Sequence, residues 1–220
     1  MSLTFNPYGL SYVDLKGGKD KMSTSTYTIQ SNYGYSIGQG DPVMVGVNGN
    51  IQVYFPPTTP TPPALLIAEY NMVGVAVSFE WYSVTGVHMK NQPYWPANTP
   101  TLNNVPAIVR VEDPTDNVYK IQVGPGGLSL TSPSTACFKN YSMSDCRSAS
   151  IPNARTSQST AYINPNTYVA GPSGNYWLSL KILGLAPDSL TSGPNSWYDP
   201  YPEVLVMVNS HMLKTGTNGL

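Results

Sequence analysis

Short apolar stretches recur along the chain and are separated by residues that favour turns. Their β-branched and aromatic residues, often alternating with polar ones, are typical of β-strands. The longest stretch, residues 72–82, is apolar enough to predict a strand near the centre of a sheet. Further strands are predicted at residues 24–29, 43–45, 51–55, 107–112, 117–123, 177–183 and 203–209. The sequence therefore predicts an all-β fold, a sandwich or partly open barrel of about nine strands.

Turn-forming residues connect these predicted strands. Asn48-Gly49 is the strongest hairpin signal in the chain and joins the strands on either side of it. Thr85-Gly86 turns the chain after the longest strand. Residues 56–63 hold five prolines and predict an extended connector. Residues 124–175 are rich in Ser, Thr, Asn and Gly and lack a clear period, so we expect an irregular loop region there.

The first 22 residues differ from the rest of the chain. They lack the periodicity of a core element, contain two turn signals and hold the densest cluster of charged residues. A terminal segment of this kind is usually frayed unless a partner holds it. We therefore expect an extended N-terminal arm at residues 1–22 and a single β domain at residues 23–220. Deletion of residues 2–20 is expected to leave the stability of that domain nearly unchanged.

The longest predicted strand also predicts a part of the core. Successive side chains of a regular strand point to opposite faces of the sheet. Val73, Val75, Val77 and Phe79 are therefore expected to share one face. Burial of each such side chain contributes roughly 1.5–3 kcal/mol to stability, so we expect this face to lie in the core.

Composition narrows the classes of function. Charged residues are 10% of the chain, against about 25% in a typical soluble domain. The 16 tyrosines suit protein–protein contacts, although a β protein with a Ser/Thr/Asn surface would have a similar composition. The net charge is −1 and no basic stripe is present, so no nucleic-acid binding is expected. No apolar run approaches the roughly 18 residues of a membrane span, and residues 1–10 do not resemble a secretory signal.

Few residues in the chain suit catalysis or metal binding. Cys137 and Cys146 are nine apart, which gives neither a disulfide framework nor a complete zinc site. We expect free thiols, and a single local disulfide stays open. We expect His88 to face solvent in a turn and His211 to hydrogen-bond at the end of the last strand. Neither is paired by spacing with a nucleophile and an orienting acid, so we expect no enzyme, no metal and no cofactor.

Carboxylates offer one further route to catalysis. Glycosidases use two carboxylates that flank the bond they cleave. Glu112-Asp113-Pro114 ends a predicted strand, so a turn is its expected role. The carboxylates from which a pair could be drawn are Glu69, Glu80, Glu112, Asp113 and Glu203.

A series of short motifs runs in order along almost the whole chain, from residue 6 to residue 213. Its members, in order, are Asn6-Pro7-Tyr8-Gly9-Leu10, Tyr27-Thr28-Ile29, Gly40-Asp41-Pro42-Val43, Val73-Gly74-Val75, Trp95-Pro96, Val111-Glu112-Asp113-Pro114, residues 118–123, residues 180–185, residues 204–209 and His211. No single motif is specific. In order and spacing, the series resembles the head decoration, or cement, proteins of tailed bacteriophages. Residues 56–63 and 131–165 depart from the family pattern.

This resemblance implies a non-enzymatic virion protein on the outer surface of the phage head, made in the host cytoplasm. It implies that copies clamp neighbouring major capsid subunits and stabilise the expanded lattice by mass action. The partners would be the major capsid protein and further copies of this chain, with a trimer favoured and a dimer possible. Tyr8 and Leu10 would anchor the arm. The expected contact residues are Asn6, Pro7, Tyr8, Leu10, Lys16, Lys19 and Lys21.

Two alternative functions stay open on the sequence. One is another β-type virion component, such as a minor head, tail or fibre module, although repeats or a coiled coil would be usual in a tail module. The other is a carbohydrate-binding β-sandwich. Its support is the set of aromatic residues that could lie exposed, Trp81, Trp95, Trp177 and Trp197.

The sparse ligand set generates one prediction about stability. Two thiols and two distant histidines do not form a convincing metal site, and no disulfide is required by the pattern. Neither a chelator nor a reductant should shift the melting temperature by more than a few degrees. Differential scanning calorimetry with EDTA and with dithiothreitol tests this. A large drop with either reagent would show that residues 131–165 contain a stabilising cross-link.

Overall fold

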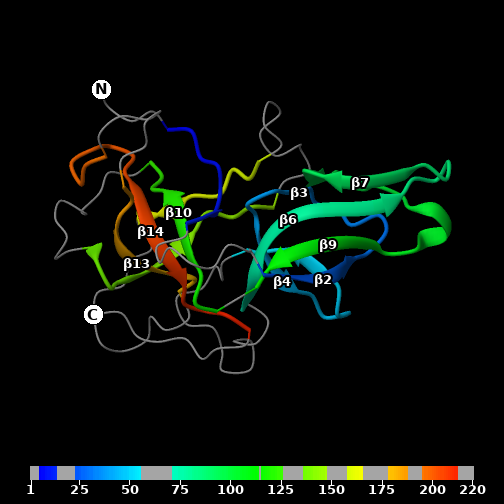
Figure 1. Cartoon of the computed structure of the whole chain (residues 1–220), viewed down its shortest axis with the longest axis horizontal. Helices are drawn as coiled ribbons and strands as arrows, with labels where there is room; N and C mark the ends of the chain where they lie inside the picture. The colour runs from blue at the N-terminus through cyan, green and yellow to red at the C-terminus, as the bar shows by residue number, and fades with distance from the viewer. Residues whose placement is uncertain are drawn as a thin grey trace.

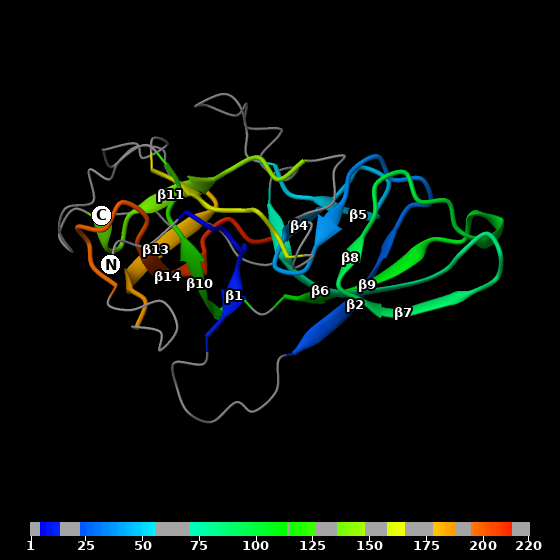
Figure 2. The ribbon, with the colours of Figure 1, turned by 90° about the horizontal axis from the view of Figure 1, so that it is seen from above.

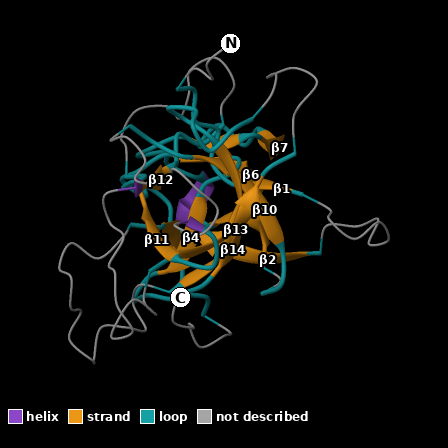
Figure 3. Ribbon diagram, turned by 90° about the vertical axis from the view of Figure 1, so that its left-hand side faces the viewer, coloured by secondary structure: helices purple, strands orange, loops and turns teal. Residues whose placement is uncertain are grey.

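The predicted all-β fold is confirmed by the computed structural model. The structure describes residues 5–13, 23–55, 71–113, 115–125, 136–147, 158–165, 178–187 and 195–212. Strands and loops make up almost all of these residues, as the view along the long axis in Figure 3 shows. One short 3-10 helix, η2, spans Leu102–Asn104. The strands form several antiparallel sheets that pack together (Figure 1).

One six-stranded sheet joins segments from both ends of the chain. Every pairing in it is antiparallel. Its order is β1 (Ser11–Tyr12), β10 (Val118–Gln122), β14 (Glu203–Val208), β13 (Leu180–Leu185), β11 (Asn140–Met143) and β12 (Ile163–Asn164). It lies at the left of Figure 1. The register runs from Ser11 opposite Lys120 to Ser142 opposite Asn164, so contacts between residues distant in sequence dominate this sheet.

The second six-stranded sheet is built mainly from the first half of the chain. Its order is β2 (Thr24–Ile29), β9 (Ala107–Glu112), β6 (Met72–Tyr82), β4 (Pro42–Val45) and β5 (Ile51–Val53), and β7 (His88–Gln92) also pairs with β6. A small sheet of β3 (Ile37–Gly38) and β8 (Tyr94–Trp95) lies beside it. Figure 2 shows this group beside the first sheet along the long axis. Buried side chains from all three sheets belong to one core cluster.

The sequence pattern located the long strands well. The bounds predicted at residues 24–29, 72–82 and 107–112 are those of β2, β6 and β9. The hairpin predicted at Asn48-Gly49 joins β4 and β5, and Gly49 has the positive φ of 79° that this turn requires. The described residues contain fourteen strands against about nine expected. Four of them are only two residues long, which is too short to produce a pattern.

The predicted face of the longest strand is wrong at its middle. Ala76 lies opposite Val111 and Phe79 lies opposite Val109, with a register shift between Ala76 and Ser78. The shift leaves Val77 as an extra residue, a bulge that turns the following side chains to the other face. Ala76 and Phe79 therefore share a face, while Val75 lies on the opposite face, across from Glu112. Val75 is buried all the same, because the first sheet and the N-terminal segment cover it.

The expected irregular region at residues 124–175 is also wrong in part. Among its described residues are β11 and β12, which extend the first sheet, and the buried side chains of Tyr141, Met143 and Ile163. Asn140 and Ser142 are buried polar residues of β11, so the strand lacks the apolar alternation that reveals a strand in sequence. The expected proline connector at residues 56–63 lies outside the described residues.

The expected separate arm is wrong for residues 5–13. Ser11 and Tyr12 form β1, which pairs with β10, and the N–H of Val13 donates to the carbonyl of Val118 at 2.9 Å. Leu10 is only 3% exposed and belongs to the core. Polar and turn-forming neighbours hide this strand in the sequence, because its partner is more than a hundred residues further along and only Leu10 carries the apolar signal. Residues 14–22 lie outside the described residues.

Replacement of Leu10 tests this correction. Leu10→Ala should reduce the free energy of unfolding by about 2–4 kcal/mol, since it removes buried atoms and leaves a cavity. Val47→Ala is a matched control, because Val47 is 98% exposed in the β4–β5 turn. Urea unfolding of the two variants measures the difference. Equal stability of the Leu10→Ala variant and the unmodified protein would show that this segment is a frayed arm, as the sequence predicted.

Candidate functional site

The two six-stranded sheets meet at a seam, which we define as the contacts between residues 8–10, 38–41 and 158–161. The N–H of Leu10 donates to the carbonyl of Gly40 at 2.9 Å, and the N–H of Ser159 donates to the carbonyl of Gln39 at 2.8 Å. Gly9 has φ 77°, and a Cβ on it would lie 2.3 Å from Cβ of Ser159. A side chain at position 9 would therefore separate the segments, which explains glycine there.

Further contacts fix the same two sheets at the beginning of β6. The N–H of Met72 donates to the carbonyl of Ser210 at 2.9 Å, and the N–H of Met212 donates to the carbonyl of Met72 at 2.8 Å. Buried His211 lies opposite Met72 in a parallel bridge. The hydroxyl groups of Tyr54 and Ser179 are 2.5 Å apart. Backbone hydrogen bonds therefore tie the end of the chain to its longest strand.

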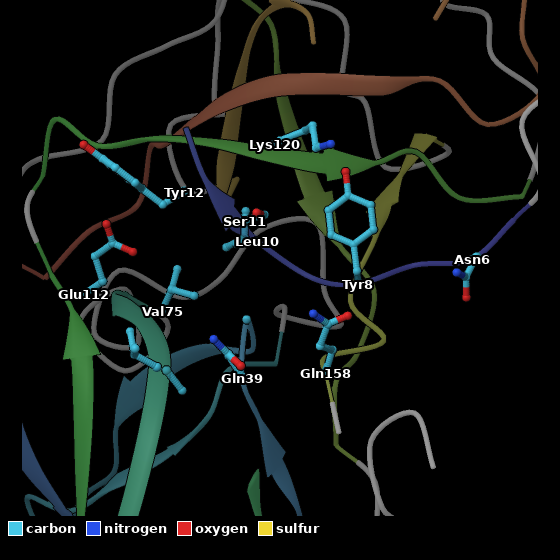
Figure 4. A pocket seen from close by; sticks show the side chains of 13 residues that line it. Asn6, Tyr8, Leu10, Ser11, Tyr12, Gln39, Val75, Glu112, Lys120 and Gln158 are labelled. Carbon is cyan, nitrogen blue, oxygen red and sulfur yellow. The ribbon is translucent and has the colours of Figure 1, made fainter. Parts of the chain in front are cut away.

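A pocket of about 320 Å³ opens at the seam, beside the N-terminal segment (Figure 4). Leu10, Val75 and Ala76 are buried residues in its wall. Polar residues from several segments complete it: Asn6, Ser11, Gln39, Glu112, Lys120 and Gln158. Tyr8 and Tyr12 also line it. The pocket thus combines an apolar floor with amide, carboxyl, ammonium and phenol groups.

One end of the pocket contains a neutralised charge. Nζ of Lys120 lies 3.1 Å from Oε2 of Glu203 and 5.4 Å from the centroid of the Tyr8 ring. Burial, and after it the negative charge of Glu203, raises the pKa of the Tyr8 phenol above its usual value. The hydroxyl is therefore a permanent neutral group at ordinary pH.

The other end contains a buried carboxyl group. Glu112 is 1% exposed, and its Oε1 accepts a hydrogen bond from Nδ2 of Asn117 at 2.7 Å. Burial raises the pKa of Glu112 to about 7, because water no longer stabilises the charged form. Figure 4 shows Glu112 and Tyr12 on one side of the pocket and Tyr8 and Gln158 on the other.

A second buried carboxyl group lies within the seam itself. Oδ2 of Asp41 accepts a hydrogen bond from the N–H of Gly38 at 2.6 Å, and the Ser159 side chain also hydrogen-bonds to it. Burial outweighs these bonds and raises the pKa of Asp41 to about 7. The thiol of Cys146 is close enough that Asp41, after burial, raises the pKa of that thiol as well. Asp41 thus links two segments of the seam, at Gly38 and at Ser159, while its charged form is disfavoured.

The structure brings three of the expected contact residues to this pocket. Asn6, Tyr8 and Leu10 line it, and Pro7 lies between them in the chain. They pack within their own protein, however, so Tyr8 and Leu10 are not anchors of a free arm. The N–H of Asn6 donates to Oε1 of Gln122 at 2.8 Å. The expected contacts Lys16, Lys19 and Lys21 lie outside the described residues.

Sequence reasoning missed the roles of Asp41 and Glu112. Both precede or border a proline-containing turn, and that local signal indicated only a turn. Asp41-Pro42 does turn the chain into β4, and Glu112 does end β9. Asp41 is in contact with Ser159, which is more than a hundred residues further along the chain. Glu112 is in contact with Asn117, the residue before β10. Only the presence of carboxylates inside otherwise apolar motifs could have drawn attention to them.

His88, Trp81 and Trp95 occupy different places from those expected, whereas His211 lies just after the last strand, as expected. His88 is in β7 rather than in a turn, half-buried, with Nε2 at 2.6 Å from Oε1 of Glu80 and its ring stacked on Tyr82. Trp81 and Trp95 are buried and pack edge to face at 5.3 Å, so they are core residues and not exposed platforms for a sugar. Both cysteines are free thiols.

The described part of the chain contains neither a candidate metal site nor a membrane-spanning helix. No group of three or more His, Cys, Asp or Glu residues there is arranged to hold a metal ion. Within those same residues, no helix has the length and apolar character needed to cross a membrane.

An exposed apolar surface lies at the far end of the second sheet. We define this hairpin tip as five residues that are 38–59% exposed, Tyr82, Val84, Val87, Val105 and Ile108. Figures 1 and 2 both place the β6–β7 turn next to η2 at that end. The turn is held by hydrogen bonds from the N–H of Ser83 to the carbonyl of Val87 and from the N–H of Gly86 to the carbonyl of Ser83, each 2.9 Å. A cavity of about 110 Å³ lies beside it.

Comparisons with known proteins gave no match: no family model, no curated protein and no solved structure is similar to this chain.

The two buried carboxyl groups predict an unusual pH dependence of stability. Because the folded-state pKa of Asp41 is about 7 and its ordinary value is 3.8, the folded protein binds a proton between these values that the unfolded chain does not. Stability is therefore highest on the acid side and falls as the pH rises to about 7, by up to about 4 kcal/mol for Asp41. Glu112 acts in the same direction.

Thermal melts between pH 5 and pH 8 measure this effect. The melting temperature should fall across that range, and Asp41→Asn should flatten the fall because the amide does not titrate. Asp116→Asn is the control, since Asp116 is exposed. A melting temperature that rises from pH 5 to pH 8 would contradict the prediction.

Proposed function

We propose that the protein is a structural component of a tailed-bacteriophage head, and that it decorates the outer surface and holds neighbouring major capsid subunits together. The sequence resemblance supports this proposal over almost the whole length of the chain. The motif residues lie where the fold is determined: Gly9, Gly40 and Asp41 at the seam, and His211 beside Met72. The resemblance therefore concerns the architecture, and the contact surface has to be found separately.

The hairpin tip is the observation that carries the proposal. Turn residues on a protein surface are usually polar, yet Val84 and Val87 lie on either side of the Thr85-Gly86 turn and are more than half exposed. The turn's own hydrogen bonds hold it in shape, so it loses little freedom when it binds. A preformed apolar projection on a protein with few charges is suited to insertion between protein subunits.

The tip also replaces the arm as the expected capsid contact. Tyr8 and Leu10 are packed within the protein, so residues 5–13 cannot leave for a neighbour without opening the first sheet and the core. The tip lies at the opposite end of the long axis from the first sheet (Figure 1). One molecule could therefore reach between subunits with its second sheet while further copies associate through other surfaces, with a trimer favoured and a dimer possible.

Binding to heads tests the proposal. Purified protein is mixed with expanded heads that are assembled from the cognate major capsid protein and lack decoration. Co-sedimentation should show saturable binding, and cryo-electron microscopy should place the chain on the outer surface with the hairpin tip at a subunit boundary. The double variant Val84→Ser, Val87→Ser should bind at least tenfold more weakly, because each buried valine contributes roughly 1.5 kcal/mol or more.

Val47→Ser is the matched control, since Val47 is a fully exposed turn valine outside the tip. It should bind as the unmodified protein does. Heads that take up no unmodified protein would refute the decoration function. Heads that bind both variants equally would refute the assignment of the tip and leave the contact to another surface.

A further inference from the structure

The seam pocket is lined by one carboxylate, that of Glu112, and by one ammonium group, that of Lys120. Glu203 pairs with Lys120, whose ammonium also lies over the ring of Tyr8. Glu112, at the other end, shares its side of the pocket with Tyr12 (Figure 4). No lysine, arginine or histidine of the described residues forms an ion pair with Glu112. The pocket thus contains an ammonium group that is already neutralised and a carboxylate, Glu112, that has no cationic partner among the described residues.

Glu112 has the geometry of a recognition group. Its Oε1 is held by Asn117, and among the described residues no hydrogen bond is made to its Oε2, although the side chain borders the pocket. The titratable and charged groups around it are Tyr119 and Lys120 from β10, Tyr12 from β1 and Asp113, the next residue in the chain. Lys120 is neutralised by Glu203. An ionised Glu112 therefore leaves this part of the pocket negative.

The remainder of the pocket suits an aliphatic chain. Leu10, Val75, Ala76 and Val77 supply apolar surface beside Glu112. The volume of about 320 Å³ is ample for one side chain of lysine size. Aromatic rings attract cations through their negative faces, and Tyr12 offers such a ring beside the carboxylate.

We propose that the seam pocket binds a primary alkylammonium group, with the ammonium beside Glu112 and Tyr12 and the methylene chain against Leu10 and Val75. The source is a lysine side chain of another protein. The side-chain amides of Asn6 and Gln39 also line the pocket, where they can donate to and accept from the peptide groups on either side of such a lysine. This inference does not rest on the proposed function.

Titrations with small probes test the inference. The methyl resonances of Leu10 and Val75 are followed by NMR during addition of butylammonium, of 1-butanol, and of Nα-acetyl-lysine methylamide. Butylammonium and the blocked lysine should shift both resonances in a saturable way, and 1-butanol should bind at least tenfold more weakly. The affinity for butylammonium should rise about tenfold per pH unit between pH 5 and pH 7 and level off above, because binding requires ionised Glu112.

Variants separate the carboxylate from the rest of the fold. Glu112→Gln should fold, since the amide keeps the shape and the bond from Asn117, and it should bind butylammonium at least tenfold more weakly. Tyr12→Leu should weaken binding two- to fivefold. Glu80→Gln is the control and should bind normally, because Glu80 pairs with His88 at the other end of β6.

Three outcomes would overturn the inference. Equal shifts from butylammonium and 1-butanol would show that the charge of the ligand does not contribute to binding. Undiminished binding by Glu112→Gln would show that the Glu112 carboxylate does not bind the ammonium group. Binding of butylammonium without binding of the blocked lysine would overturn the assignment to a protein lysine and leave only a small free amine.

Discussion

The backbone hydrogen bond from Leu10 to Gly40 lies at the point on which the rest of the structure depends. It joins a segment that belongs to the first sheet to a turn that leads into the second, and residue 159 packs on both. Three segments far apart in sequence meet there, with Gly9 giving the space that a side chain would fill. β1 is paired with β10 in the first sheet, so this crossing fixes that edge of the first sheet against the turn that leads into β4. The pocket opens where the two meet, and Asp41 is buried next to the crossing.

That arrangement has an electrostatic consequence. The chain has few charges, and among its described acidic residues Asp41 and Glu112 are buried near the seam without a cationic partner. A buried carboxyl group costs free energy when it ionises, unless a cation or several hydrogen-bond donors compensate. Asp41 has two donors and Glu112 has one, and in both cases burial outweighs them. The folded protein therefore contains two carboxyl groups near the seam whose charged forms are disfavoured.

How much of the structure the sequence predicts depends on how far apart along the chain the interacting residues lie. β2, β6 and β9 were predicted to the residue because local alternation or a long apolar run reveals them. β1 and β11 were not, because one is two residues long and the other buries polar side chains. The bulge at Val77 is equally hidden, since it is defined by the register with β9 and not by composition. The pocket residues Asn6, Tyr8 and Leu10 were selected for a different reason, as parts of an arm, and Glu112 was taken for a turn residue.

The position of residues 5–13 decides which surfaces are free for partners. A segment that supplies a strand, a core side chain and a pocket wall is already fully committed to its own fold. A partner must therefore bind a surface that is already formed in the free protein. The described part of the chain offers two such surfaces, the hairpin tip and the seam pocket. The tip is apolar and projects, whereas the pocket is concave and holds a buried carboxyl group, so the two surfaces suit different chemical groups. Both surfaces are held by backbone hydrogen bonds close to them. Because little conformational entropy is lost when a rigid surface binds, even a small contact area can contribute to affinity.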